Sequence, residues 1–381
     1  MNARRIAILG STGSVGSQAL DVLQDHPEQR IYALSAGRNI SMLRQQIQQF
    51  SPSRVVVLDA ADALALSKEF PLVQVDYGPE ALAELGSDSH VDLLISAVVG
   101  IDGLPPLVAA LRSGKTVALA NKEPLVAAGE LLMSTALRYG ANLLPVDSEH
   151  SAIFQCLNGV DRRDDTLHEI IITASGGPFY RRSEEELSHV TPEEAVKHPR
   201  WRMGAKISVD SATMMNKGLE IIEARWLFGV RPDQIRVTIH PESIVHSMVS
   251  FVDGSVLAHL AVPDMRLPIA YALSWPGRWE NSWPALDWTQ SMELHFYPPD
   301  HSPRFQALRL ARQAMDIGGT MPAVMNVANE CAVRAFLDRQ LPFTHIVPTV
   351  ERIMQQHNTV ALKDLQQIQE ISHWVENVFP Q

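Results

Sequence analysis

Over the first 147 residues, short apolar runs alternate with segments that have helical periodicity. Several of these runs are apolar throughout, as expected of strands that are buried on both faces of a sheet. Helix-like segments such as 14–24, 41–50 and 104–112 separate them. The alternation predicts a doubly wound, Rossmann-type parallel sheet, because parallel strands need crossover connections, which are usually helices. The expected strands are Ile6–Leu9, Ile31–Ser35, Val55–Leu58, Leu93–Val98, Val117–Ala120 and Leu143–Val146.

After residue 147 the pattern changes. Strand-like runs mix with a loop punctuated by glycine and proline at 176–206 and a strong helix at 213–228. A segment rich in proline and tryptophan follows, and it has too little periodicity for a helix or strand. Helical patterns then continue to the end. The predicted organisation is an N-terminal α/β domain (1–147), a central α+β domain (148–275), a linker (276–303) and a C-terminal helical bundle (304–381).

The boundaries of several later elements can also be predicted. Thr320 is expected to be the N-cap of a helix that has Pro322 in its first turn. The expected strands are 169–173, 236–239 and 255–260, and the expected C-terminal helices are 304–317, 322–340 and 344–356.

Composition excludes several classes of partner. The 381 residues carry a formal net charge of −11, which argues against non-specific binding to nucleic acid or to an anionic membrane. A phosphorylated substrate remains compatible, since a few local cations suffice for it. No apolar run approaches the roughly 18–20 residues that span a bilayer, and the first apolar run is too short for a signal peptide.

The two cysteines, Cys156 and Cys331, have no CxxC spacing. A disulfide framework or a thiolate zinc site is therefore not expected, and the predicted location is a reducing cytoplasm.

The sequence GSTGSVG at 10–16 follows the first expected strand and opens the first expected helix. Its G-x-x-G-x-x-G spacing is close to the dinucleotide-binding pattern, in which glycines let the backbone approach a pyrophosphate at a helix N-terminus. The flanking strand and helix favour dinucleotide binding over a plain tight turn.

The end of the second strand indicates which nicotinamide cofactor binds. An NAD site usually has an acidic residue there, which binds the ribose 2′-hydroxyl. This sequence has Ala36-Gly37-Arg38-Asn39 instead, and an arginine suits the 2′-phosphate of NADP. The alternative is that Arg38 is a solvated loop charge.

Polar clusters follow two further strands of the expected sheet. Asn121-Lys122-Glu123 comes after one strand and Asp147-Ser148-Glu149 after another, so both should lie at the carboxyl edge, where such sheets bind ligands. If strand geometry continues to Glu149, Asp147 and Glu149 share a side. The alternative is that Asp147 only caps the helix that starts near His150.

A third carboxylate lies on the helix at 213–228. Asn216 and Glu220 are four residues apart, and Lys217 and Glu220 are three apart, so the three share a face. The alternative is a surface ion pair between Lys217 and Glu220. Three carboxylates, Asp147, Glu149 and Glu220, would form an all-oxygen site that favours Mg²⁺ or Mn²⁺ over zinc.

Several hydroxyl, amide and ammonium donors could surround a phosphate. Ser175 lies in a glycine-softened loop after a strand, which suits anion capture by the backbone. Trp201 lies in the segment 197–204, which is expected to be a lid over a ligand, although packing of Trp201 onto the domain surface is the alternative. The candidate phosphate donors are Ser148, Ser175, Ser211, Asn216 and Lys217.

Together these segments resemble the 1-deoxy-D-xylulose 5-phosphate reductoisomerase family. The similar motifs are "GSTGSVG", "AGRN", "ANKE", "PVDSEHSAIFQ", "ASGGPF", "HPRWRMGAKISVDSATMMNKGLE" and "VPDMR", in order from residue 10 to 266, and "NVANE" in the C-terminal region. The resemblance implies an NADPH-binding domain, a central catalytic domain that also forms a homodimer contact, and a helical bundle. Pro124 departs from the family, which often has serine there, and puts only the local helix start in question.

The resemblance also implies roles for individual residues. Asp147, Glu149 and Glu220 would be the ligands of Mg²⁺ or Mn²⁺, with Co²⁺ a further candidate. The substrate, a phosphorylated sugar, would contact Lys122, Ser148, Glu149, Ser175, His198, Ser211, Asn216, Lys217 and Glu220. NADPH would contact Thr12, Gly13, Ser14, Val15, Gly37, Arg38, Asn39, Asn121, Glu123 and Gly204. Trp201 would be the lid residue, with Met203, His246 and Met265 near the site.

The implied reaction rearranges 1-deoxy-D-xylulose 5-phosphate to a branched aldehyde, which NADPH reduces to 2-C-methyl-D-erythritol 4-phosphate. A divalent metal would polarise the substrate's carbonyl and hydroxyl oxygens. Two other functions remain to be compared. A metal-free NADP semialdehyde dehydrogenase would need a nucleophilic cysteine, and neither Cys156 nor Cys331 is well placed; a non-enzymatic NADP sensor would not need three carboxylates.

Overall fold

The computed structural model describes residues 3–160, 163–198, 201, 203–300 and 302–379; Pro199, Arg200 and Arg202 of the expected lid lie outside the described residues. Two compact units are built from interleaved segments of the chain. The first comprises Met1–Pro124, Leu132–Ser151 and Asp264–Ser282, and the second comprises Leu125–Leu131, Ala152–Pro263 and Trp283–Gln381.

The first unit contains a parallel sheet of seven strands, in the order β4-β3-β2-β1-β5-β6-β7. Its central strands are apolar and almost fully buried, as the sequence predicts. The order reverses between β1 and β5, which makes their carboxyl ends the switch point where such sheets bind ligands. The strands are β1 (Arg5–Leu9), β2 (Arg30–Ala36), β3 (Arg54–Val57), β4 (Gln74–Tyr77), β5 (Leu93–Ser96), β6 (Thr116–Leu119) and β7 (Asn142–Pro145).

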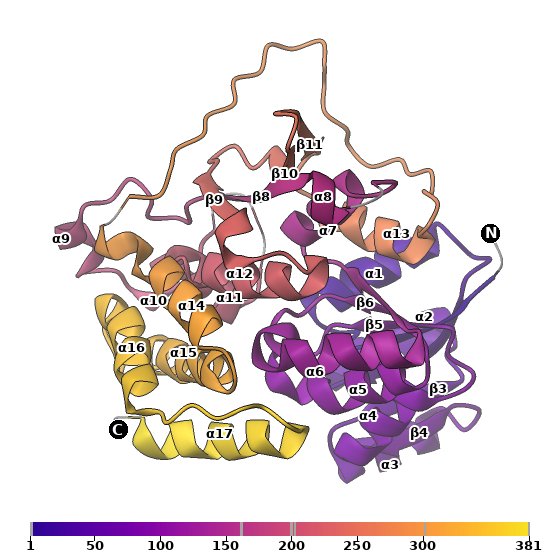
Figure 1. Ribbon diagram of the computed structural model, residues 1–381. Coiled ribbons are helices and arrows are strands. Elements are labelled where there is room, and N and C mark those ends of the chain that lie inside the picture. Colours follow the sequence, from indigo (N-terminus) through magenta and orange to yellow (C-terminus); the bar gives the residue numbers. More distant parts are fainter. Residues whose placement is uncertain (1–2, 161–162, 199–200, 202, 301, 380–381) are drawn as a thin grey trace. The chain divides into compact units, whose positions relative to one another are not determined.

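Helices connect successive strands of this sheet (Figure 1). The connections include two helices that were not predicted, α3 and α4, which flank the unpredicted edge strand β4. Pro124 lies in the first turn of α6, where proline is favoured, so the departure from the family leaves the helix start intact. The helices are α1 (Ser14–Gln24), α2 (Ile40–Phe50), α3 (Ala60–Glu69), α4 (Gly78–Ser87), α5 (Leu104–Arg112) and α6 (Glu123–Tyr139), with the 3₁₀ turn η1 (Gly100–Gly103) before α5.

A late segment of the chain returns to the first unit. Helix α13 (Arg266–Ser274) packs against α1. The Arg4 guanidinium donates hydrogen bonds to the carbonyls of Leu273 (3.2 Å) and Trp275 (3.0 Å). His26 stacks on Trp279, with ring centroids 4.0 Å apart. The Rossmann-type unit is therefore completed by residues far along the sequence.

The second unit contains a mixed sheet of four strands in the order β11-β10-β8-β9, with β8 parallel to β9 and antiparallel to β10. The strands are β8 (Leu167–Ala174), β9 (Ile235–Ile239), β10 (Val245–Phe251) and β11 (Val256–Leu260). The sequence predicts three of these, and β10 was missed. Helix α7 (Ser148–Cys156) begins in the first unit and continues into the second. The other associated helices are α8 (Arg163–Thr166), α9 (Glu184–Leu187), α10 (Pro192–Ala195), α11 (Ala205–Ala212), α12 (Met215–Phe228) and the 3₁₀ turn η2 (Pro232–Gln234).

The rest of the second unit is an irregular segment followed by helices. Within the described part of 283–302, the chain forms no helix and only one isolated bridge, between Tyr297 and Ile239. Helix α15 is buried on nearly all sides and packs against α11, α12, α14, α16 and α17. The elements are η3 (Pro303–Phe305), α14 (Gln306–Ile317), α15 (Met321–Leu337), η4 (Phe343–His345), α16 (Ile346–Gln356) and α17 (Leu365–Val378).

The fold class is confirmed, and Thr320 is the N-cap residue of α15 with Pro322 in the first turn, as predicted. The Thr320 side chain, however, makes no hydrogen bond to the first amides of the helix. The Thr320 hydroxyl instead accepts a hydrogen bond from the backbone of Val360 (3.1 Å) and lies 2.8 Å from Nε2 of His357. A long-range partner therefore takes the place of the capping hydrogen bond.

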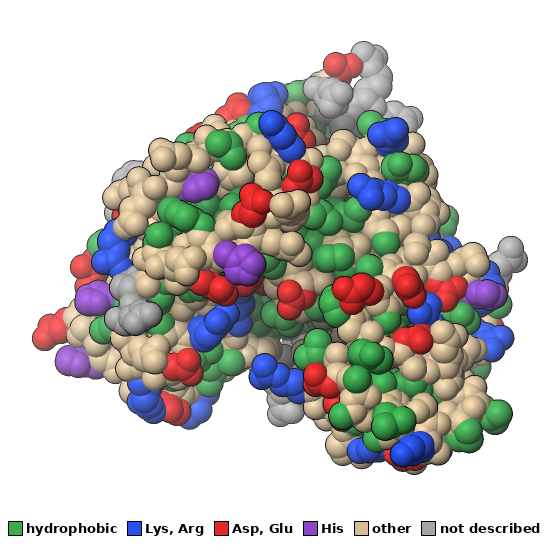
Figure 2. All heavy atoms as spheres, turned by 90° about the horizontal axis from the view of Figure 1, so that it is seen from below, with side chains coloured by type: hydrophobic (Ala, Val, Ile, Leu, Met, Phe, Trp, Pro, Cys, Tyr) green, Lys and Arg blue, Asp and Glu red, His purple; other side chains and the backbone are tan. Residues whose placement is uncertain are grey.

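None of the described helices is both long enough and apolar enough to cross a membrane. On the face seen in Figure 2, acidic and basic side chains are interspersed, without a broad field of Lys and Arg.

Candidate active site

The glycine turn after β1 has the geometry that the sequence predicts. Gly10 has a left-handed backbone (φ +79°), and a Cβ there would lie 2.6 Å from the carbonyl oxygen of Ala97, directly after β5. A Cβ on Gly16 would collide with the carbonyl of Gly10. Gly13 is the N-cap of α1 and offers no side chain to its first amides. The helix N-terminus thus stays accessible to an anion at the switch point.

The residues expected to bind the cofactor lie along this edge of the sheet. Arg38 is exposed after β2, and Asn39 caps α2 by accepting a hydrogen bond from the Met42 amide (3.1 Å). Asn121 is buried after β6, where its amide donates to the carbonyl of Gly100 (3.3 Å). Thr12, Val15, Gly37 and Glu123 belong to the same turns, whereas Gly204 is the N-cap of α11 in the second unit.

Lys122 and Asp147 form an ion pair at the ends of neighbouring strands. Strands β6 and β7 are paired in register, so the residues that follow them meet, and Lys122 Nζ lies 2.5 Å from Asp147 Oδ2. Asp147 Oδ1 accepts a hydrogen bond from the Ser148 amide (3.1 Å) at the start of α7. The Asp147 carboxylate therefore combines the ion pair with Lys122 and a hydrogen bond from the adjacent backbone amide.

Glu149 is placed differently from the strand-based expectation. Strand β7 ends at Pro145 and α7 begins at Ser148, because Ser148–Cys156 takes up helical geometry directly. Period-two alternation therefore does not reach Glu149. The Ser148 hydroxyl donates to Glu149 Oε2 (2.5 Å), so both side chains belong to one polar cluster.

His150 is a member of this cluster that the sequence analysis missed. It is fully buried, and its Nδ1 lies 3.7 Å from Asp147 Oδ2. The signal available in the sequence was the spacing of three residues in "DSEH", which places His150 one helical turn after Asp147.

In the second unit, Asn216, Lys217 and Glu220 meet on one face of α12. Asn216 Nδ2 donates to Glu220 Oε1 (2.5 Å), and the Lys217 ammonium pairs with Glu220 Oε2. Glu220 is fully buried and Lys217 is nearly so. The shared face is confirmed, and the interpretation as a surface ion pair is wrong.

A second cluster in this unit connects Ser175 to the expected lid. Ser175 follows β8, and its hydroxyl lies 3.1 Å from His198 Nε2. The backbone amide of Trp201 donates to His198 Nδ1 (3.0 Å), and the Trp201 ring lies 6.2 Å from the His246 ring, centroid to centroid. Ser175, His198, Trp201 and His246 are therefore neighbours, with the Trp201 backbone making the link to His198.

Ser211 lies in the last turn of α11, close to the glycine loop. Gly176 and Gly177 have left-handed backbones (φ +82° and +71°), and a Cβ on Gly177 would lie 2.6 Å from the Ser211 carbonyl oxygen. Met203, half-buried, precedes α11, while Met265 belongs to the first unit as the N-cap of α13.

The two cysteines lack the properties of a nucleophile. Burial raises the pKa of the Cys156 thiol to about 11, and it also raises the pKa of the buried Cys331. Both thiols therefore stay protonated near neutral pH, so neither provides the nucleophilic cysteine that a semialdehyde dehydrogenase needs.

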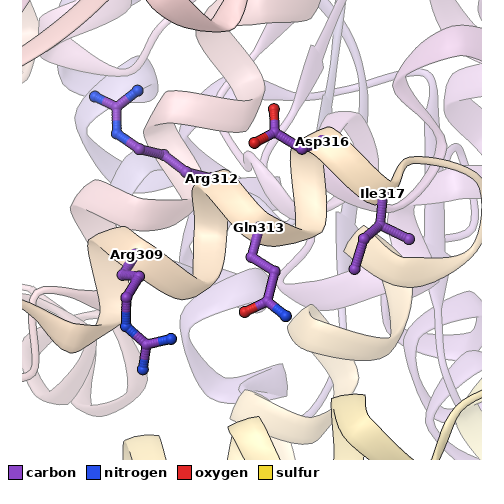
Figure 3. A pocket seen from close by; sticks show the side chains of 5 residues that line it. All are labelled: Arg309, Arg312, Gln313, Asp316 and Ile317. Carbon is purple, nitrogen blue, oxygen red and sulfur yellow. The ribbon is translucent and has the colours of Figure 1, made fainter.

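A shallow pocket on α14 lies outside these clusters (Figure 3). Its two cations already have partners: Arg309 pairs with Glu351 (2.9 Å), and Arg312 donates to the carbonyls of Pro232 (3.2 Å) and Ile235 (2.7 Å). Figure 3 shows the two guanidinium groups pointing to different sides of the helix.

Comparison with known proteins identifies the family. The model "1-deoxy-D-xylulose 5-phosphate reductoisomerase" matches residues 6–129, and models of its C-terminal domain match 143–228 and 260–378. The reductoisomerase of Pelodictyon phaeoclathratiforme is 50% identical over 380 residues, which cover 98% of each chain. The chain belongs to the 1-deoxy-D-xylulose 5-phosphate reductoisomerase family.

Other members of the reductoisomerase family agree. The Heliobacterium modesticaldum protein is 51% identical over 377 residues, covering 97% of this chain and 95% of that one. A solved reductoisomerase from Zymomonas mobilis in complex with NADPH is 42% identical, with a TM-score of 0.91 over 98% of this chain and 97% of that chain. Another, in complex with NADPH, fosmidomycin and magnesium, is 39% identical, with a TM-score of 0.93 and the same coverage. The predicted family, enzyme class and fold are confirmed.

Proposed function

We propose that this enzyme converts 1-deoxy-D-xylulose 5-phosphate into 2-C-methyl-D-erythritol 4-phosphate with NADPH and a divalent metal. The observation that carries the proposal is the cluster of Lys122, Asp147, Ser148 and Glu149 at the carboxyl edge of the sheet. That edge also carries the glycine turn of a dinucleotide site. Names and bound groups of full-length relatives support the same reaction.

The carboxylates fit a magnesium or manganese ion. We assign Asp147, Glu149 and Glu220 as its ligands, since hard divalent cations prefer carboxylate oxygen. Asp147 and Glu220 each hold a lysine as counter-ion, Lys122 and Lys217 respectively. A buried carboxylate needs such a partner, and a divalent ion would share or replace it.

The substrate's phosphate would be held by neutral and cationic donors in the second unit. Ser175, Ser211, Asn216 and Lys217 supply hydroxyl, amide and ammonium groups, and His198 is within hydrogen-bonding distance of Ser175. Lys122 and Ser148 would contact the reacting end. Binding at the remote phosphate can hold the reacting carbons in place through the rearrangement.

When bound, the metal supplies Lewis acidity at two substrate oxygens and NADPH supplies the hydride. The chain's own residues bind and orient. Arg38 is placed to pair with the 2′-phosphate of NADPH, and the amides of the first turn of α1 face its pyrophosphate. Trp201 and His246, with Met203 and Met265, would cover the substrate and exclude water.

The predicted domain roles remain part of the proposal. Residues 1–147 would bind NADPH, 148–275 would carry catalysis and the dimer contact, 276–303 would link, and 304–381 would support the catalytic helices. A cytoplasmic location agrees with the two unpaired thiols.

A homodimer is also proposed. Strand β11 lies at the edge of the four-stranded sheet, and its Val256 and Leu257 are 51% and 48% exposed. An exposed apolar edge strand favours pairing with another chain. We expect Leu257→Glu to convert the dimer to a monomer in light-scattering measurements, while Leu137→Glu, at an exposed leucine of α6, leaves it dimeric.

The function is tested by mixing the protein with 1-deoxy-D-xylulose 5-phosphate, Mn²⁺ and NADPH and following the nicotinamide absorbance. We expect NADPH oxidation that stops with chelator and returns with Mg²⁺ or Mn²⁺. No oxidation contradicts the substrate, equal rates with NADH contradict the cofactor, and full activity in chelator contradicts the metal.

A further inference from the structure

Asp210 is a buried carboxylate that none of the proposed roles uses. It lies in the last turn of α11, next to Ser211, and is 1% exposed. An isolated buried carboxylate is strongly unfavourable unless it is paired and hydrogen-bonded. Its partners therefore show what holds this turn in place.

Two partners from different helices satisfy Asp210. Lys206, one turn earlier on α11, places its Nζ 3.0 Å from Asp210 Oδ2. Asn329, fully buried on α15, donates from Nδ2 to Asp210 Oδ1 at 2.7 Å. Because an ionised carboxylate only accepts hydrogen bonds, it fixes the orientation of the Asn329 amide. The pair thus pins the end of α11 to the most buried helix of the unit.

The turn that follows Asp210 has little freedom. The Thr213 hydroxyl donates to the Asp210 carbonyl (3.3 Å) and accepts from the Met215 amide (3.3 Å). Met214 between them has a left-handed backbone (φ 64°), which is unusual for a residue with a Cβ. A shift at Asp210 would therefore pass through this turn to Asn216 and Lys217.

Ser211 is constrained from the other side as well. Its carbonyl oxygen packs directly against Gly177, since a Cβ at that glycine would lie only 2.6 Å from it. The Ser211 backbone is thus held between the glycine loop and the Asp210–Asn329 pair. Displacement of either support would move the hydroxyl.

We propose that Asp210 and Asn329 are positioning residues for substrate binding, which hold Ser211 and the α11–α12 turn in the geometry that receives the phosphate. The pair acts through Ser211 and does not itself touch the substrate. This inference rests on the proposed role of Ser211, so Ser211→Ala is measured alongside.

The decisive variant is Asn329→Asp, which places a second carboxylate against Asp210. Repulsion between the two buried carboxylates should displace the turn. The KM for 1-deoxy-D-xylulose 5-phosphate should then rise by about tenfold or more. The KM for NADPH should change much less. The exchanged pair Asp210→Asn with Asn329→Asp restores one amide facing one carboxylate, so its substrate KM should return to within about threefold of the original.

A matched control separates positioning from stability. Asn326 lies one turn earlier on α15, is also fully buried, and donates to Glu330 (3.1 Å). Asn326→Asp likewise places a second carboxylate against an existing one, that of Glu330, but here both residues lie on α15. It should lower the melting temperature without raising the substrate KM.

The outcomes are distinct. An unchanged substrate KM in Asn329→Asp, an equal rise in Asn326→Asp, or no rescue in the exchanged pair overturns the inference. If Asn329→Asp does not fold, Lys206→Met is measured together with the exchanged pair. Lys206→Met should raise the substrate KM, and an unchanged KM in that variant overturns the inference. If Ser211→Ala itself leaves the substrate KM unchanged, the proposed role of Ser211 fails; if only Asn329→Asp does so, that role stands and the positioning inference alone fails.

Discussion

Lys122 Nζ lies 2.5 Å from Oδ2 of Asp147, at the ends of two register-paired strands. The pair is largely buried, with side chains 6% and 15% exposed. The lysine therefore occupies the position of a counter-ion beside a proposed metal ligand.

Replacing Lys122 by Met should destabilise the metal-free enzyme. Loss of one partner of a buried ion pair leaves an uncompensated charge. The free energy of unfolding should fall by about 3 kcal/mol, the low end of the usual cost, because Asp147 keeps some solvent contact. Added Mn²⁺ should recover part of this loss, since a bound cation stabilises the folded state. Denaturant unfolding with and without Mn²⁺ measures both, and Lys68→Met, at an exposed lysine of α3, should change neither.

Replacing Glu220 by Gln should weaken metal binding. The change keeps the shape of the side chain but removes one anionic ligand, and we expect Mn²⁺ affinity to fall by about a hundredfold, or roughly 3 kcal/mol. Titration calorimetry with Mn²⁺ alone tests this without turnover. Glu130→Gln, at an exposed acid of α6, is the control, and an unchanged affinity in Glu220→Gln would remove this residue from the ligand set.

Gly16→Ala should weaken NADPH binding by more than about tenfold, equivalent to 1.4 kcal/mol. The added Cβ collides with the Gly10 carbonyl, so the first turn of α1 must move away from the glycine loop. NADPH fluorescence gives the dissociation constant. Asp21→Ala, exposed on the same helix, should bind NADPH normally.

Arg38→Ala should narrow the preference for NADPH over NADH. The guanidinium is expected to contact only the 2′-phosphate, so the KM for NADPH should rise by about tenfold or more while that for NADH stays similar. The ratio of kcat/KM values for the two cofactors reports the change. Arg44→Ala, on the adjacent helix and paired with Glu69, should leave the ratio unaltered.

Alkylation of Cys156 should depend on pH as a thiol with a pKa of about 11 requires. Only the thiolate reacts, so below that pKa the rate should rise about tenfold per pH unit and be very low near neutrality. Mass spectrometry after iodoacetamide treatment gives the rate. The double variant Cys156→Ser, Cys331→Ser should keep full turnover; its loss would reopen a cysteine-based mechanism.

Much of the fold and part of the site could be predicted because the signals are local. Buried parallel strands read as continuous apolar runs, and the polar residues that follow β6 and β7 are placed by strand register. The shared face of Asn216, Lys217 and Glu220 follows from helical periodicity alone.

The parts that escaped prediction depend on long-range partners. Thr320 is the predicted N-cap residue of α15, but its hydroxyl accepts a hydrogen bond from the Val360 amide and none from the first amides of the helix. The Asp210–Asn329 pair joins residues 119 positions apart, and no local pattern indicates it. Strand β4 was missed because it is a half-exposed edge strand whose residues are mixed in polarity.

The return of residues 264–282 to the first unit affects how the chain can fold during synthesis. Helix α13 covers α1, and Arg4 and His26 have partners in this segment. The first unit therefore remains incomplete on the ribosome until residue 282 has emerged, after the β8–β11 sheet has been made. A fragment that stops at residue 151 would expose the surface that α13 normally covers, so an isolated first unit would need residues 264–282 fused back onto it.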